Sequence, residues 1–162
     1  MRHGRIKVPI VKTFLLLLLS GLMIQVSAAS PNESEKQLIA ANSKSPKGAA
    51  VYLIKPLDGE TFNARDAIEV SFGLKGMGIA PAGLAFENTG HHHLLIDQKT
   101  LPNLKLPIPA SNKIIHYGKG QTQTEILLEP GTHTLQLILG NQYHIPHDPP
   151  LISDKITIHV SD

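Results

Sequence analysis

The chain has 162 residues, with 15 Lys and Arg, 13 Asp and Glu, and no cysteine. The lack of cysteine excludes disulfide bonds, thiolate nucleophiles and thiolate metal ligands. The near-neutral charge, with no basic run after the first residues, gives no electrostatic basis for nucleic-acid binding.

Residues 1–29 have the composition of a secretory signal peptide. Four basic residues precede a short apolar stretch at 14–19, and small residues follow at 26–29. The apolar stretch is shorter than the ~20 residues that a stable membrane span needs. We therefore expect cleavage near residue 29, no membrane span in the mature protein, and a periplasmic or secreted bacterial location. The chain after residue 29 has 11 basic and 13 acidic residues, a net charge of −2.

Residues 30–48 are polar and small, which predicts a linker. Residues 49–162 form the predicted folded domain. Seven short extended segments, separated by Gly, Pro and Asn, are predicted as strands: 50–55, 67–74, 91–97, 113–117, 122–128, 132–139 and 154–160.

The alternation within these segments predicts an all-β fold. In 132–139, His133, Leu135, Leu137 and Leu139 share one face, and the other face is mostly polar. Seven strands in about 110 residues predict an immunoglobulin-like seven-stranded antiparallel β-sandwich. The chain has no Cys or Trp, so this prediction concerns architecture and not ancestry.

Three long connections separate the strands: 75–90, 98–112 and 140–153. The last one contains His144, His147 and three prolines, which stiffen it. Loops of this length in a compact domain are usually functional or disordered. The stiffness favours function.

The sandwich topology predicts that six histidines meet at one end of the domain. His91, His92 and His93 begin the third strand, His116 lies near the end of the fourth, and His144 and His147 lie in the last long loop. His133 and His159 fall at the opposite end, where structural roles are expected.

Imidazole is a common ligand of transition metals, and successive side chains on a strand point to opposite faces. We therefore expect His91 and His93 to point together and His92 to point toward the core. The predicted metal ligands are His91 and His93 with one or two of His116, His144 and His147. A set of imidazoles without sulfur suits Cu²⁺ or Zn²⁺. Glu87 and Asp148 are candidate acceptors that would orient an imidazole.

Other interpretations stay open. The same loop end is also consistent with an interaction module that recognises an envelope protein or a glycan without metal, and tandem histidines can serve packing alone. The sequence assigns no catalytic residue and no residue that binds an organic cofactor. A metal-assisted enzyme would lack an evident general base other than Glu87 or Asp148.

Several segments together resemble a bacterial secreted family known as domain of unknown function 4399. They are 73–83 (GLKGMGIAPAG), 88–97 (NTGHHHLLID), 116–122 (HYGKGQT), 130–137 (PGTHTLQL) and 144–150 (HIPHDPP). The resemblance covers about residue 51 to the C-terminus. It implies an exported, small, β-rich domain. The family has no activity that can be carried over to this chain, and the resemblance does not establish a metal.

Overall fold

The computed structural model describes residues 32–33 and 44–162. Chain contacts divide the protein into Met1–Ser30 and Pro31–Asp162, and all described residues belong to the second unit. The predicted signal peptide and residues 34–43 of the predicted linker lie outside the described residues. In the described part of the chain, no helix has the length and apolar character that a membrane crossing requires.

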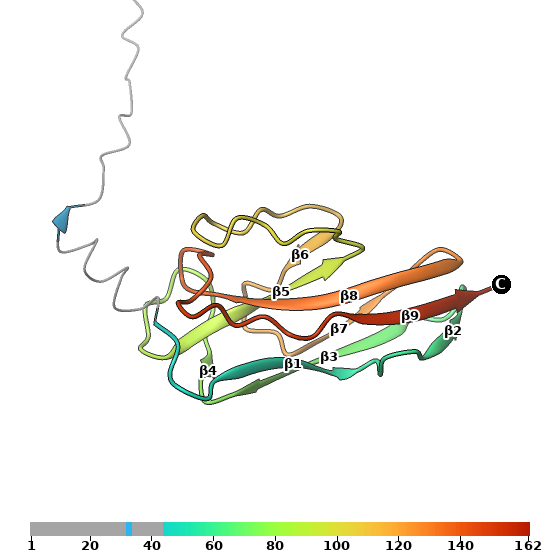
Figure 1. The fold of residues 1–162 in the computed structure, drawn as a ribbon, viewed down its shortest axis with the longest axis horizontal. Helices are drawn as coiled ribbons and strands as arrows, with labels where there is room; N and C mark the ends of the chain where they lie inside the picture. The colour runs from blue at the N-terminus through green and yellow to red at the C-terminus, as the bar shows by residue number, and fades with distance from the viewer. Residues whose placement is uncertain (1–31, 34–43) are drawn as a thin grey trace, which may run out of the picture. The chain divides into compact units, whose positions relative to one another are not determined.

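Residues 44–162 form two β-sheets and contain no helix, so the all-β prediction is confirmed (Figure 1). The smaller sheet has the strand order β1 (Ala50–Lys55), β3 (Ile68–Lys75) and β7 (Gln123–Ile126). The larger sheet has the order β2 (Thr61–Asn63), β9 (Ile156–Ser161), β8 (Gly131–Gly140), β5 (Thr89–Ile96) and β4 (Gly78–Ile79), with β6 (Ile114–His116) also paired to β5.

The seven predicted strands correspond to β1, β3, β5, β6, β7, β8 and β9, with small differences at their ends. Two strands, β2 and β4, were not predicted. They pair in parallel with β9 and β5, respectively, whereas the remaining pairs are antiparallel. The described residues thus form nine strands with mixed pairing. The immunoglobulin-like assignment stays a prediction.

The main core lies between the two sheets. From the larger sheet, Leu94, Leu135 and Leu137 are completely buried, and from the smaller sheet Val70 and Phe72 pack against them. Burying a side chain of this size stabilises a fold by roughly 1.5–3 kcal/mol. The inward face of the predicted strand 132–139 is therefore confirmed for its leucines.

A second, smaller core lies on the other face of the larger sheet. It consists of Leu95, Ile108, Ile114 and Ile138, with Leu104 and Ile152 packed against it. In Figure 1 the connection between β5 and β6 lies on the side of the larger sheet away from β1 and β3. This connection supplies Leu104 and Ile108 and covers the sheet there. As a result β5 is buried on both faces. Strands of this kind usually do not alternate between polar and apolar residues.

Lys44 and Ser45, which precede β1, contact the loop between β8 and β9. The backbone N–H of Ser45 donates to the carbonyl of Asp148 at 3.2 Å, and its hydroxyl donates to the carbonyl of Pro149 at 2.7 Å. Lys44 and Asp148 also form an isolated β-bridge. Lys44 and Ser45 fall within the predicted linker, and they lie close to the loop that contains His147.

Candidate metal centre

The three consecutive histidines of β5 divide between its two faces. His92 faces the main core, where its ring centroid lies 5.0 Å from that of Phe72. Its Nδ1 lies 3.3 Å from the carbonyl oxygen of Gln121. His91 and His93 project from the opposite face, as the alternation of side chains along a strand requires. The predicted separation of His92 from its neighbours is therefore observed.

Strand pairing brings His116 to the same place. In the antiparallel register of β5 and β6, His116 lies directly opposite His93. The ring centroids of His91 and His93 are 4.9 Å apart, and each lies about 5 Å from the ring of His116. One nitrogen of each ring lies within 4.8 Å of the other two. His91, His93 and His116 are therefore close enough to bind one metal ion.

His144 lies beside this group, and its ring comes from the loop after β8. Its centroid is 4.6 Å from that of His116, 5.0 Å from His91 and 5.9 Å from His93. His147 is buried close to the backbone of Gly90, next to His91, and it is outside the group of three. All five predicted residues thus lie in one region, at different distances from its centre.

Burial leaves several imidazole nitrogens without a hydrogen-bond partner. The side chains of His91 and His93 have no solvent exposure. Among the described residues, neither ring nitrogen of either side chain has a partner, and the same holds for Nε2 of His116. A buried polar group without a partner costs about 1–3 kcal/mol and is rare in native structures. A bound metal would satisfy one nitrogen of each ring.

The site favours the neutral form of His91, His93 and His116 by lowering the pKa of each. Burial is the main cause that lowers the pKa of His91 to about 3, and His116, His144, His92 and His147 add to the effect. Burial, followed by His91, His116 and His144, lowers the pKa of His93 to about 3. Burial and His144 also lower the pKa of His116. Neutral imidazoles offer the lone pairs that a metal needs.

The donor set fits a transition metal. Neutral nitrogen ligands suit Zn²⁺, Cu²⁺ and related ions. Nitrogens about 2.0–2.1 Å from a tetrahedral Zn²⁺ lie about 3.4 Å from one another, and those of His91, His93 and His116 lie within 4.8 Å of one another. Three protein ligands leave a fourth position for another donor.

Three glycines provide room for the rings. A Cβ atom on Gly118 would overlap the ring of His116, and one on Gly140 would lie 2.8 Å from Cε1 of His93. A Cβ atom on Gly90 would lie 2.9 Å from Nε2 of His147. These glycines were not among the predicted site residues, although each lies within two residues of a histidine or a predicted strand end.

Glu87 and Asp148, the carboxylates proposed to orient the imidazoles, are exposed. Among the described residues, the ring nitrogens of His91 and His93 have no hydrogen-bond partner, so neither carboxylate orients these two rings. The two remaining histidines have other partners. His133 Nδ1 lies 3.0 Å from Oδ2 of Asp97 and its Nε2 lies 2.8 Å from the Glu129 carbonyl. His159 Nδ1 lies 3.3 Å from the Thr132 hydroxyl.

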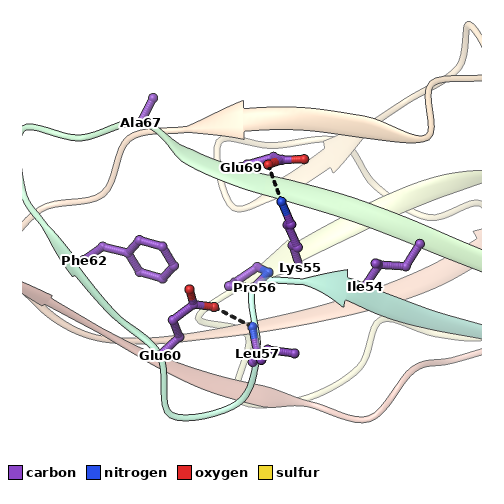
Figure 2. Close-up of a pocket in the computed structure, with 8 residues that line it drawn as sticks. All are labelled: Ile54, Lys55, Pro56, Leu57, Glu60, Phe62, Ala67 and Glu69. Atoms are coloured by element: carbon purple, nitrogen blue, oxygen red, sulfur yellow. Dashed lines mark hydrogen bonds and ion pairs between the residues drawn. The ribbon is translucent and has the colours of Figure 1, made fainter.

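A separate pocket of about 440 Å³ contains no histidine (Figure 2). Its polar groups satisfy one another: Lys55 Nζ donates to Glu69 at 2.9 Å, and the Leu57 N–H donates to Glu60 at 2.8 Å. None of its lining residues has a buried polar atom without a partner. The pocket therefore gives less indication of a ligand than the histidines do.

The fold and the site define an all-β domain with a buried histidine cluster close enough to bind a metal. The family model described as "Domain of unknown function (DUF4399)" matches residues 70–161, which is more than half of the chain. The chain therefore belongs to this family, as its motifs predicted, and the matched region includes all five candidate ligands. No curated protein and no solved structure matches the chain.

Proposed function

We propose that this domain binds one divalent transition-metal ion, Cu²⁺ or Zn²⁺, through His91, His93 and His116. One observation carries the proposal: the three imidazoles have ligand nitrogens within 4.8 Å of one another. Both ring nitrogens of His91 and His93, and Nε2 of His116, are buried without a hydrogen-bond partner among the described residues, and this supports the proposal because such groups need a compensating interaction.

The proposed role is storage, delivery or sensing of the metal in the cell envelope. The location depends on the signal peptide predicted for residues 1–29. The coordination depends on sheet geometry, because β5 and β6 hold the three imidazoles at fixed register. The protein residues supply binding and orientation, and the proposal includes no reaction step.

Elemental analysis tests the proposal directly. The full chain is expressed with its own leader, purified without a tag from the envelope fraction, and analysed for metals. We expect about one equivalent of Cu or Zn per chain. The variant with both His91→Ala and His93→Ala should lose it, because losing a ligand costs more than the 10–100-fold that losing an orienting partner costs. His159→Ala, outside the cluster, is the control.

A different result would favour the alternative function. If the purified protein holds no metal and does not bind added Cu²⁺ or Zn²⁺ tightly, the metal proposal is wrong. The histidine region would then be examined as a surface for an envelope protein or a glycan, with variants that shorten residues 142–150.

A further inference from the structure

We propose that His144 is a fourth, detachable ligand, and that the bound metal is exchangeable cargo. This inference rests on the proposed metal binding. The sheet would hold the ion through three imidazoles, while the loop histidine completes its coordination and leaves when another donor takes its place. In that exchange one metal–nitrogen bond breaks, one bond to the incoming donor forms, and the oxidation state is unchanged.

The four rings differ in how they are held. His91, His93 and His116 lie on paired strands, and the first two are completely buried. His144 lies on a loop and is only half-buried. Its ring is 4.6 Å from that of His116, but its nitrogens are outside the group that lies within 4.8 Å. The ring of His144 therefore has to turn toward the other three rings to bind the metal. Because His144 is partly exposed to solvent, the ring can also turn away again.

The backbone of His144 is held in place. Its N–H donates to the carbonyl of Asn141 at 2.8 Å, and its carbonyl accepts from the N–H of Ile108 at 2.9 Å. Its φ of 66° lies in the left-handed region, which is uncommon for a residue other than glycine. Because the backbone is fixed on both sides, side-chain rotation is the freedom that remains.

Asn141 positions this loop. Its side chain is completely buried, and its Oδ1 accepts from the N–H groups of Tyr143 at 2.9 Å and Ile145 at 3.1 Å. These two residues flank His144 on both sides. Asn141 therefore acts through His144 by fixing the turn that aims its ring at the cluster.

Gly140 permits the close approach of this turn. A Cβ atom there would lie 3.3 Å from Cα of His144 and 2.8 Å from Cε1 of His93. The absence of a side chain lets the loop histidine come alongside the sheet histidine.

The first test removes the imidazole and keeps the loop. His144→Gly accepts the left-handed backbone without strain. The full chain, loaded with Cu²⁺ alone or Zn²⁺ alone, is studied by X-ray absorption for its nitrogen donors. Release is followed by stopped flow into excess chelator. We expect the variant to retain one equivalent of metal, to lose one nitrogen donor, and to release the ion at least about 10-fold faster. His159→Gly is the matched control.

The second test separates positioning from stability. Asn141→Ala should also lose the nitrogen donor and release the ion faster, whereas Asn141→Asp should restore both values, because a carboxylate accepts the same two hydrogen bonds. Thermal unfolding of each variant is measured alongside. A variant that only destabilises the fold would change the melting temperature without changing the donor number.

Three results would overturn the inference. If His144→Gly keeps the wild-type donor number and release rate, His144 is not a ligand. If it abolishes binding as completely as loss of His93 does, the ligand is permanent and not detachable. If the wild-type protein itself binds neither ion, the underlying metal proposal fails, and this outcome is recognised before any variant is compared.

Discussion

Gly118 shows how one missing side chain shapes the site. Its position two residues after His116 leaves space that the imidazole occupies. A methyl group there would overlap Cε1 and Nε2 of His116, and the ring would have to move away from its place in the cluster. The site thus depends on a residue that has no donor atom.

Gly118→Ala is expected to weaken metal binding by at least about 10-fold, as for other changes that misorient a ligand. Affinity is measured by competition with a chelator of known strength. Gly78→Ala is the control, because its new Cβ would meet only the methyl group of Thr89, at 3.3 Å. Unchanged affinity in Gly118→Ala would show that His116 does not coordinate the ion from this position.

The depressed pKa values of His91 and His93 predict how protons compete with metal. Both values are lowered to about 3, mainly by burial, so the folded protein keeps these nitrogens neutral well below pH 6.5. As long as the domain stays folded, protonation of His91 and His93 should lower the metal affinity little between pH 7 and about 5. It should then fall as the pH approaches these values, because protons occupy the same nitrogens. Isothermal titration with Zn²⁺ across this range measures it. A steep loss of affinity centred near pH 6.5 would contradict the buried-ligand geometry.

At the scale of elements, the connection between β5 and β6 packs on the face of β5 that carries His91 and His93. The connection between β5 and β6 places Ile108 in the smaller core, where it is 5% exposed, and its N–H binds the carbonyl of His144. This one segment therefore packs on the sheet and holds the loop that carries His144.

Ile108→Ala is expected to lower the free energy of unfolding by about 2–4 kcal/mol, because a buried side chain is lost and a cavity forms. Urea denaturation of the full chain measures this change. Leu106→Ala, at a residue that is 56% exposed, should change the stability little. Equal effects of the two substitutions would mean that the smaller core contributes nothing specific.

Strand positions were predictable where side chains alternate or form a short apolar run. In β8, for example, Leu135, Leu137 and Leu139 occupy every second position, and this alternation predicts a strand. The strands β2 and β4 have three and two residues, too few to show any period. The parallel pairing of β2 depends on β9, which is far away in the sequence, whereas β4 pairs with the nearby β5.

The candidate site was predictable in part for the same reason. The alternation in β5 separated His92 from its neighbours, and topology brought His116 and His144 near them. The loop conformation set by Asn141 could not be predicted, because it depends on backbone hydrogen bonds within a turn. The smaller core was missed, although Ile138 on the mostly polar face of 132–139, and Leu95 on the same face as His91 and His93, were a signal that the sheet is covered on both sides.

At the scale of the whole molecule, buried neutral histidines make the metal-free fold sensitive to acid. The pKa values of His91 and His93 are lowered to about 3, and burial lowers that of His92 to about 4. In the unfolded chain the same groups titrate near 6.5. Below that pH the unfolded state takes up protons that the folded state refuses, so the free energy of unfolding falls as the pH falls.

The metal-free domain should therefore lose stability between about pH 6.5 and 4, by on the order of 1 kcal/mol per pH unit for each of these groups. His133 opposes this trend: burial lowers its pKa, but hydrogen bonds to Glu129 and Asp97 outweigh burial and raise it. Urea denaturation at several pH values measures the slope. His92→Phe should flatten it, and a stability that is constant over this range would contradict the prediction.

The contact of Lys44 and Ser45 with Asp148 and Pro149 has a practical consequence for preparing the protein. Any peptide fused before residue 44 joins the domain beside the loop of His147. β9 ends at the other end of β8, where Val160 pairs with Gly131, and the ten-residue strand β8 separates that point from Gly140 by about 30 Å. An oligohistidine tag fused directly before Lys44 would therefore compete for the ion next to its binding site, whereas a purification tag after Asp162 would keep its own imidazoles far from the cluster.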